Sequence, residues 1–211
     1  MENFRWVGLA KKLTIENDIL ERDIWVNKGL LCGIDEVGRG CLAGPVISVA
    51  IILKDSIDRS LMTDSKKLTP VKRAYLANYI LNNTLSVGIG ECSNHEIDRV
   101  NIHNATLSSM KIAITNLNMV PDLTYIDGLY KPDIDIISEC VVQGDNLIPE
   151  ISAASIVAKV LRDNIMVKLD KILPVYGFSR HKGYGTKEHL QAIELFGPSV
   201  YHRFSFAPLK N

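Results

Sequence analysis

The run Val46–Leu53 constrains the fold of this chain more than any other segment. It reads VISVAIIL, nearly all apolar and rich in β-branched residues, which is typical of a strand buried on both faces. A strand of this kind needs a sheet that is covered on both sides. The apolar run Leu30–Asp35 precedes it after a short connection, so we expect these two strands to pair antiparallel.

The rest of the chain alternates apolar strands with segments of helical periodicity. Thr69 and Pro70 predict a helix start, because threonine caps helices and proline is favoured in the first turn. The strand that ends at Asp127 follows a helix, so it can pair in parallel with the first strand. We predict further strands at 84–91, 123–127 and 134–142, and helices at 9–27, 70–81, 95–100, 104–117, 149–169 and 187–195.

These elements predict one α/β domain over residues 1–211, with a mixed five-stranded sheet flanked by helices. Residues 1–29 form an N-terminal helical extension, and residues 173–211 form a small, basic, helical C-terminal segment. Small residues at 152–155 and 158 predict that the helix at 149–169 lies close to the sheet. Phe204 and Phe206 stand two apart, which suggests an extended segment packed on the core.

Carboxylates follow the ends of the predicted strands. Asp35 and Glu36 end the first strand, Asp127 ends a later one, and Asp145 follows the next. Ends of neighbouring parallel strands meet at one edge of a sheet. Four carboxylates gathered there would repel one another unless cations neutralise them, and oxygen ligands suit Mg²⁺ or Mn²⁺ rather than zinc. Two such ions can drive phosphodiester hydrolysis.

Two alternatives stand beside this hypothesis. Each acid by itself is also typical of a turn, as in the Asp-Gly pair at 127–128. Asp35 and Glu36 are adjacent, so they can share a metal site only if the strand has ended or is bulged there. The glycines at 38 and 40 make such a break plausible.

Arg39 stands between Gly38 and Gly40, where the backbone can approach a phosphate or a sugar hydroxyl closely. The same stretch fits the loose G-x-G-x-x-A dinucleotide pattern. That pattern must open a helix, whereas Pro45 and a β-branched run follow here, so we reject a dinucleotide site.

Positive charge gathers at the C-terminal end. Residues 159–211 hold nine Lys or Arg and four Asp or Glu, a net of +5, in a chain whose formal net charge is zero. Arg180, His181, Lys182 and Tyr184 suit a sugar–phosphate backbone, although such loops also occur as ordinary surface. Lys66 and Lys67 could hold a second nucleic-acid strand or simply lie in a solvated loop.

Other features exclude several classes of protein. The cysteines at 32, 41, 92 and 140 are too far apart for a zinc pair, so we expect buried thiols in a reducing compartment. The N-terminus has no apolar signal region, and no apolar run approaches the ~20 residues of a membrane helix. We therefore expect a cytoplasmic protein that has no membrane contact.

Together these motifs resemble the ribonuclease HII family, the type 2 ribonucleases H, over nearly the whole chain. The motifs that carry the resemblance are GIDEVGRG at 33–40, DSKKL at 64–68, NIHNAT at 101–106, IDG at 126–128, GD at 144–145, ISAASIVAK at 151–159, HKGYGT at 181–186 and SFAP at 205–208. Several motifs in one order are far more specific than any single motif.

The resemblance implies a ribonuclease H-like fold and an endoribonuclease that uses Mg²⁺ or Mn²⁺.

 It implies cutting of RNA in RNA–DNA hybrids and cutting 5′ of single ribonucleotides in duplex DNA, which leaves 3′-hydroxyl and 5′-phosphate ends. The family's four metal-binding acids match Asp35, Glu36, Asp127 and Asp145, which hold two ions. The Gly38–Gly40 loop and the family's tyrosine, Tyr184 here, read the ribose 2′-hydroxyl, the group that separates RNA from DNA. The implied partner is nucleic acid, and we expect a monomer.

The chain departs from the family pattern at three positions. Cys41 replaces a proline, Gln143 replaces a lysine, and Phe204 stands where an arginine is common. The last two changes remove positive charge near the substrate, so we expect weaker phosphate binding. Two rival functions stay open at this point: another nuclease of the same fold, such as ribonuclease HIII, and a non-catalytic module that binds RNA–DNA hybrids.

Overall fold

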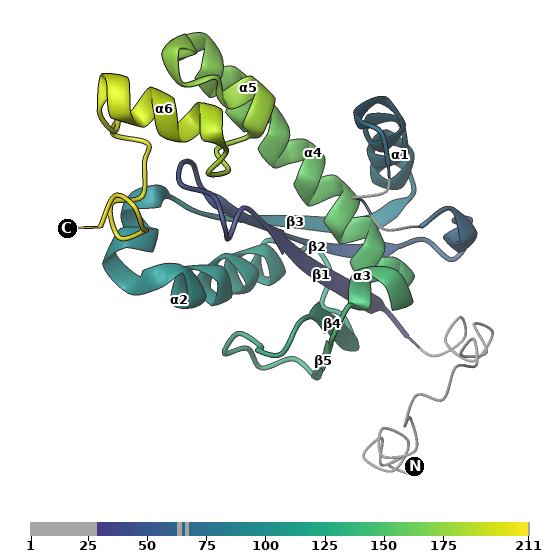
Figure 1. The fold of residues 1–211 in the computed structure, drawn as a ribbon. Helices are drawn as coiled ribbons and strands as arrows, with labels where there is room; N and C mark the ends of the chain where they lie inside the picture. Colours follow the sequence, from purple (N-terminus) through teal and green to yellow (C-terminus); the bar gives the residue numbers. More distant parts are fainter. Residues whose placement is uncertain (1–28, 63–64, 66–67, 211) are drawn as a thin grey trace, which may run out of the picture.

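The computed structural model describes residues 29–62, 65 and 68–210. The helix expected at 9–27 lies outside the described residues, as does the rest of the N-terminal extension before residue 29. Figure 1 shows a central sheet with helices on both faces and a group of short helices at one end. The predicted α/β class is therefore confirmed.

Five strands form one mixed sheet, with bounds of Leu31–Val37 for β1, Val46–Leu53 for β2, Thr84–Cys92 for β3, Leu123–Asp127 for β4 and Ser138–Val141 for β5. Their order across the sheet is β3-β2-β1-β4-β5. The antiparallel pairing of β1 with β2 and the parallel pairing of β1 with β4 are both as predicted. β3 extends the antiparallel side and β5 the parallel side, so β1 is the central strand.

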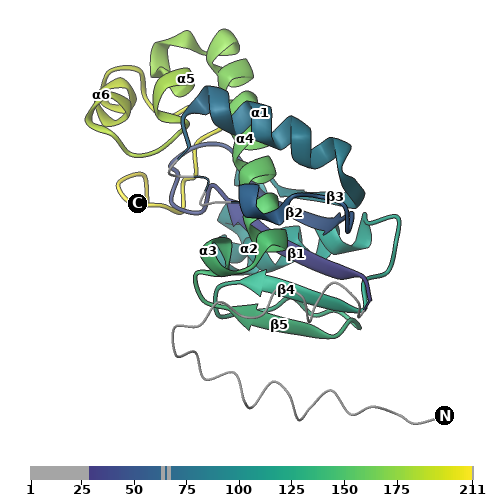
Figure 2. The ribbon, with the colours of Figure 1, turned by 90° about the vertical axis from the view of Figure 1, so that its right-hand side faces the viewer.

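Helices cover both faces and one end of this sheet, with bounds of Pro70–Asn82 for α1, Asn94–Thr115 for α2, Gly144–Leu147 for α3, Pro149–Ile172 for α4, Phe178–His181 for α5 and Lys187–Phe196 for α6. Single turns of 3-10 helix, η4 and η6, lie at Arg59–Leu61 and Pro174–Tyr176. In Figure 2, α1 and α4 lie on one face of the sheet, and Figure 1 shows α2 on the other. The predicted pair of helices at 95–100 and 104–117 forms α2, which is broken at Asn101 (φ 69°).

The burial of β2 follows from these two layers. Val49 and Ile51 pack into a core with α1 and α4, whereas Ala50 and Ile52 pack into a second core with α2. Every residue of β2 is buried, as its composition predicted. Alternation of side chains along a strand supplies both cores from one segment.

Helix α4 lies unusually close to β1. A Cβ atom on Gly33 would lie 2.1 Å from the backbone carbonyl carbon of Glu150, so only glycine fits at this crossing. Ala153, Ala154 and Ser155 are buried on the same helix. The predicted close packing of the small-residue face is therefore confirmed, and it fixes α4 across the strand that carries Asp35.

Two strand predictions were wrong at their ends. β1 continues to Val37, beyond the expected end at Asp35. β5 begins at Ser138 rather than at 134, because Ile134 and Ile136 pack against the apolar core under α2 instead of joining the sheet. The strand at this edge is short, and its partner β4 is short as well.

The C-terminal segment packs against the far end of α4. Tyr176, Phe178 and Ile193 form an apolar cluster with Met166 and Leu169 of α4. Phe206 packs at the margin of this cluster. The expectation that both C-terminal phenylalanines pack on the core was wrong for one of them, since turns in this segment leave Phe204 46% exposed.

Three of the four cysteines agree with the prediction of buried thiols, and one does not. Cys32, Cys41 and Cys92 are buried free thiols, as predicted. Cys140 is exposed, contrary to prediction, because β5 lies at the edge of the sheet. Within the described residues, no helix has both the length and the apolar character needed to cross a membrane.

Candidate active site

Asp35 and Asp127 lie side by side on the two central parallel strands. Ile34 of β1 is paired with Ile126 of β4, and an aspartate follows each of them. Asp35 is buried, and burial raises its pKa well above the usual carboxyl range. The charges of Glu36 and Asp127 raise this pKa further. The structure thus brings these carboxylates together, as expected for parallel strand ends.

Glu36 joins them from a strand that has not ended. The register between β1 and β2 is unbroken through Val37, so the expectation of a strand end or bulge at Asp35 was wrong. The pKa of Glu36 is raised mainly by burial; Arg39 lowers it, and the charge of Asp127 raises it. Glu36 Oε1 lies 3.4 Å from Arg39 Nη1. Its other oxygen, Oε2, is buried and has no hydrogen-bond partner among the residues that the structure describes.

Asp145 reaches this end of the sheet through α3. The amide of Gly144 donates a 2.7 Å hydrogen bond to Asp127 Oδ1, which fixes the start of α3 beside β4. Gln143 precedes it in the left-handed conformation (φ 57°), which turns the chain out of β5. Asp145 is buried, and its Oδ1 accepts a 2.9 Å hydrogen bond from Asn146 Nδ2.

The chemistry of these groups fits a hard divalent cation. All the donors are carboxylate oxygens, and the negative charge of Asp127 destabilises the ionised forms of Asp35 and Glu36. Glu36 Oε2 is a buried acceptor that no described residue satisfies. As placed, no three His, Cys, Asp or Glu side chains among the described residues form a group that could hold a metal ion. The match to Mg²⁺ or Mn²⁺ thus rests on the type of donor atom and on the repulsion among the carboxylates.

The loop at residues 38–40 leaves β1 directly beside the carboxylates. Gly38 has a φ of +97°, and a Cβ there would lie 2.2 Å from Arg162 Nε, so this position requires glycine. No atom of the described part of the chain lies within 4 Å of the position that a Cβ on Gly40 would take. The Arg39 side chain is 45% exposed. The loop therefore presents an open backbone and one cation next to Glu36.

Tyr184 lies against this loop. Cys41 and Tyr184 form an isolated antiparallel bridge, and the amide of Leu42 donates a 2.8 Å hydrogen bond to the carbonyl of Gly183. The Tyr184 ring is 41% exposed. Its pKa is raised, first by burial and then by the neighbouring Cys41 thiol, so the hydroxyl stays protonated at neutral pH. The sequence separated these residues by more than 140 positions, and the fold joins them.

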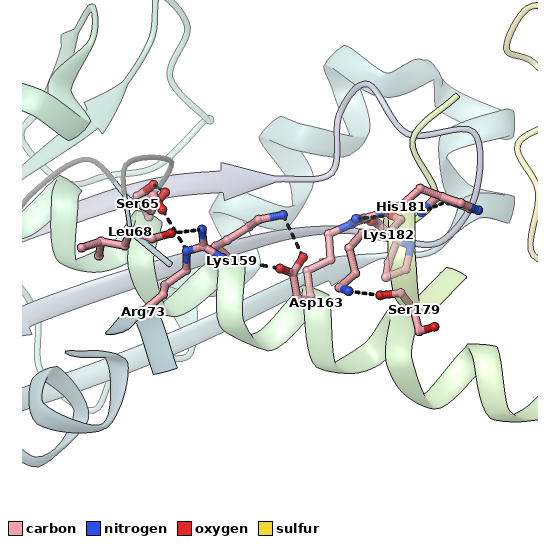
Figure 3. Close-up of polar contacts among 12 residues, drawn as sticks. Ser65, Leu68, Arg73, Lys159, Asp163, Ser179, His181 and Lys182 are labelled. Atoms are coloured by element: carbon pink, nitrogen blue, oxygen red, sulfur yellow. Dashed lines mark hydrogen bonds and ion pairs between the residues drawn. The ribbon is translucent and has the colours of Figure 1, made fainter. Parts of the chain in front are cut away.

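Lys159 is a site residue that the sequence analysis missed. Its Nζ lies 5.8 Å from the centre of the Tyr184 ring and 2.8 Å from Asp163 Oδ1. Figure 3 shows Lys159 and Asp163 on α4, between the segment of Ser65 and that of Lys182. The available signal was spacing, since Ser155, Lys159 and Asp163 recur every fourth residue and share one helix face.

Comparison with known proteins decides the family. A sequence model described as Ribonuclease HII matches residues 32–208. The chain belongs to the ribonuclease HII family. A ribonuclease HII from Pelagibacter ubique is 49% identical over 183 residues, which cover 86% of this chain and 98% of that protein.

Two solved structures share the fold. The ribonuclease H2 from Pyrococcus horikoshii has a TM-score of 0.72 and 20% identity, over 85% of this chain and 94% of that one. The ribonuclease HIII named Bst-RNase HIII, in complex with Mn²⁺, has a TM-score of 0.65 and 17% identity, over 89% and 70%. At these identities the likeness establishes the ribonuclease H-like architecture alone.

Membership of the ribonuclease HII family makes this chain a metal-dependent hydrolase of RNA phosphodiester bonds, with ribonuclease H activity on RNA–DNA hybrids. The reading as a non-catalytic hybrid-binding module is therefore set aside. The family match also favours ribonuclease HII over ribonuclease HIII as the type of enzyme.

The basic residues expected at the substrate divide into three groups in this ribonuclease HII. Lys66 and Lys67 lie outside the described residues. Arg180 is exposed but forms an ion pair with Glu188. Lys182 Nζ donates to the carbonyl of Ser179, as Figure 3 shows. Arg180 is exposed and Lys182 is half-buried, and each already has a partner within the protein.

His181 belongs to a buried histidine array rather than to an open surface. The amide of Gly183 donates to its Nδ1 at 3.1 Å, so its Nε2–H donates to the carbonyl of Tyr176 at 2.7 Å. Both ring nitrogens are used inside the protein. The direct substrate contact expected of His181 is not supported by this placement.

The other two histidines continue the array. The amide of Ser199 donates to His202 Nδ1 at 2.9 Å, so Nε2 of His202 carries the proton. It donates to His189 Nε2 at 3.0 Å, and His189 Nδ1–H donates to the carbonyl of Tyr184 at 2.9 Å. These neutral tautomers tie the backbone of Tyr184 to the turn at residues 199–202. The sequence analysis did not connect these histidines, which are 13 residues apart.

Proposed function

We propose that this enzyme, besides cutting the RNA strand of RNA–DNA hybrids, cuts duplex DNA on the 5′ side of a single embedded ribonucleotide. The observation that carries the proposal is the contact between two parts of the site. The buried carboxylates at the ends of β1 and β4 lie directly beside the loop that bridges to Tyr184. A group that can recognise a 2′-hydroxyl therefore adjoins the groups suited to hold metal ions.

In this proposal Asp35, Glu36, Asp127 and Asp145 hold two Mg²⁺ or Mn²⁺ ions. When bound, the ions supply an activated water and stabilise the leaving oxygen. The carboxylates orient this chemistry from rigid strand ends, and their mutual repulsion favours occupancy by cations. Cutting leaves a 3′-hydroxyl and a 5′-phosphate, and no side chain acts as the nucleophile.

The Gly38–Gly40 loop and Tyr184 select the ribonucleotide. The open backbone at Gly40 allows close approach of a sugar–phosphate, and the protonated Tyr184 hydroxyl can donate to or accept from a 2′-hydroxyl. Lys159 adds a positive charge beside the tyrosine ring. Lys66, Lys67, Arg180 and Lys182 contact phosphates further along the duplex in this account.

The organisation of the chain is part of the same proposal. Residues 1–211 act as one ribonuclease H-like catalytic domain, with 173–211 as the part that contacts substrate. The continuous apolar packing of the C-terminal segment onto α4 supports this view. We expect the enzyme to act as a monomer in the cytoplasm, which light scattering and cell fractionation would test.

A panel of labelled duplexes tests the proposal. One duplex contains a single ribonucleotide in DNA, one is all DNA, and one is an RNA–DNA hybrid, each with Mg²⁺, Mn²⁺ or EDTA. We expect metal-dependent cutting of the first and third duplexes and none of the second. Cutting of the hybrid alone would overturn the proposed recognition of single ribonucleotides while leaving the ribonuclease H activity in place.

A further inference from the structure

Two arginines are completely buried next to the ribonucleotide-reading loops. Arg162 of α4 and Arg203 of the C-terminal segment each have 0% relative exposure. Neither forms a salt bridge with any residue that the structure describes. Burying a charge is costly unless hydrogen bonds replace its lost hydration. The hydrogen bonds that the two guanidinium groups donate must therefore account for their burial.

Arg203 holds the loop that follows β1. Its Nε and Nη2 both donate to the carbonyl of Gly44, at 3.0 and 2.8 Å. Its Nη1 donates to the carbonyl of Arg39 at 2.9 Å. Its backbone amide donates to the carbonyl of Leu42 at 2.8 Å. One residue thus spans both ends of the loop that contains Gly40.

Arg162 joins this loop to the segment of Tyr184. Its Nε donates to the carbonyl of Pro45 at 3.0 Å, and its Nη2 donates to the carbonyl of Ala43 at 3.0 Å. Its Nη1 donates to the carbonyl of Lys182 at 2.8 Å, two residues before Tyr184. A single planar fork therefore connects the two loops that meet at the Cys41–Tyr184 bridge.

We propose that Arg162 and Arg203 are positioning residues for ribonucleotide recognition, because their guanidinium groups hold the Gly38–Gly40 loop in register with Tyr184. The inference rests on the proposed function of those two loops. Each arginine donates to backbone carbonyls that lie in different directions. The planar guanidinium group has several N–H donors in fixed directions, whereas lysine has a single ammonium group and cannot reach all of these carbonyls at once. The arginines do not touch the substrate in this account; they set the gap in which the ribose lies.

Conservative variants test this inference. Arg203→Lys and Arg162→Lys keep a positive charge and remove the fork. With the single-ribonucleotide duplex, we expect each variant to lower kcat/KM by about 10-fold, the loss expected for charged hydrogen bonds. The inhibition constant of an uncut all-DNA competitor should stay within about 2-fold, since general phosphate contacts do not depend on the gap. A loss of folded protein would lower the apparent kcat and leave the inhibition constant unchanged, so kcat is expressed per mole of folded enzyme, with the folded fraction of each variant measured by circular dichroism.

Arg73→Lys is the matched control. Arg73 is also buried, and it donates to two backbone carbonyls, those of Ser65 and Leu68, at 2.8 Å each. Figure 3 shows it on the side of Lys159 away from Lys182. Unlike the other two arginines, Arg73 also forms an ion pair with Asp163, 3.7 Å away, and a lysine at this position keeps the positive charge for that pair. The substitution removes the forked donors to the two carbonyls and leaves both ribonucleotide-reading loops untouched. The ratio of kcat/KM to the inhibition constant should therefore stay near the wild-type value.

Hydrogen exchange supplies a readout that does not depend on activity. The Leu42 amide, which donates to the Gly183 carbonyl, reports directly on the junction of the two loops. We expect its exchange to quicken by about 10-fold in Arg203→Lys and Arg162→Lys, because each variant loses charged hydrogen bonds that hold the junction closed. We expect no change in Arg73→Lys. Unchanged Leu42 exchange together with wild-type kcat/KM in both variants would overturn the inference. A wild-type enzyme that ignores single ribonucleotides would instead overturn the proposed function, and the exchange result would still decide whether the arginines hold the loops together.

Discussion

The hydrogen bond from the Gly144 amide to Asp127 Oδ1, 2.7 Å long, joins the end of β4 to the helix turn that carries Asp145. Asp127 therefore has two roles, since it also raises the pKa of Asp35 and of Glu36. The contact explains how an acid from a separate segment reaches the carboxylates of β1. It also means that changes at Asp127 affect the placement of Asp145.

Asp35→Asn should separate activity from stability. Removing one carboxylate should lower the rate of hybrid cutting by roughly 10²-fold or more, as expected for loss of a metal ligand. Because burial and two neighbouring charges raise the pKa of Asp35, its ionised form costs stability at neutral pH. The variant should therefore melt at a higher temperature than wild type in EDTA and gain less from added Mn²⁺. A variant that cuts at a near-normal rate would remove Asp35 from the site.

Gly33→Ala should destabilise the fold at the crossing of β1 and α4. The added Cβ would lie 2.1 Å from the backbone carbon of Glu150, and neither backbone can move without disturbing the sheet or the helix. We expect a loss of about 3 kcal/mol or more in the free energy of unfolding, at the upper end for overpacking. Urea unfolding measures this value. Gly40→Ala is the control, since no atom of residues 29–62, 65 and 68–210 lies within 4 Å of its Cβ position.

Acid should weaken the histidine array. Burial, and then the charge of His189, lower the pKa of His202 from 6.5 to about 4. The unfolded chain takes up the proton first, so the stabilisation is complete above pH 6.5 and is lost as the pH falls toward 4. The loss amounts to about 3 kcal/mol. Asp35 and Glu36 act in the opposite direction, because their raised pKa values favour the folded state in acid.

The variant His202→Gln isolates the contribution of His202, because Asp35 and Glu36 are present in both proteins and their effect cancels. The free energy of unfolding of wild type and variant is measured at pH 7 and at pH 4.5, and the change between the two pH values is compared. The variant should be less stable at pH 7 and should lose less on acidification. An equal pH dependence in the two proteins would contradict a neutral, buried His202.

Restoring the two missing cations should strengthen substrate binding. Gln143 is exposed at the turn before α3, and Phe204 is 46% exposed on the C-terminal segment, so both positions can accept a longer charged side chain. Gln143→Lys and Phe204→Arg should bind the RNA–DNA hybrid more tightly at low salt. Each new phosphate contact should steepen the dependence of log affinity on log salt by roughly 0.9. Affinity that is no higher than wild type across a salt titration would contradict this expectation.

Local patterns predicted the layers and much of the site. The apolar composition of β2 indicated burial on both faces, and the acids after apolar runs indicated where Asp35 and Asp127 would meet. These features depend on neighbouring residues in the sequence, so they can be read without the fold. The end of β1 was misjudged because pairing with β2 extends the strand through polar residues that would otherwise favour a turn.

Long-range contacts account for what the sequence did not predict. The histidine array joins residues whose tautomers are set by amides in other turns, and the buried arginines serve carbonyls more than 100 positions away. Neither group has a local signature, since a histidine or an arginine in isolation is usually interpreted as a surface residue. Cys140 was misjudged for a similar reason, because its exposure depends on β5 lying at the sheet edge.

The central claim is that this enzyme recognises one 2′-hydroxyl next to the bond that it cuts. The most direct measurement uses one DNA duplex in which a single position carries a 2′-hydroxyl, a 2′-fluorine or a 2′-hydrogen, with Mg²⁺ present throughout. We predict cutting 5′ of that position for the hydroxyl alone, and a large loss of this cutting in Tyr184→Phe. Equal cutting of the duplexes with 2′-hydroxyl and 2′-hydrogen would contradict the account.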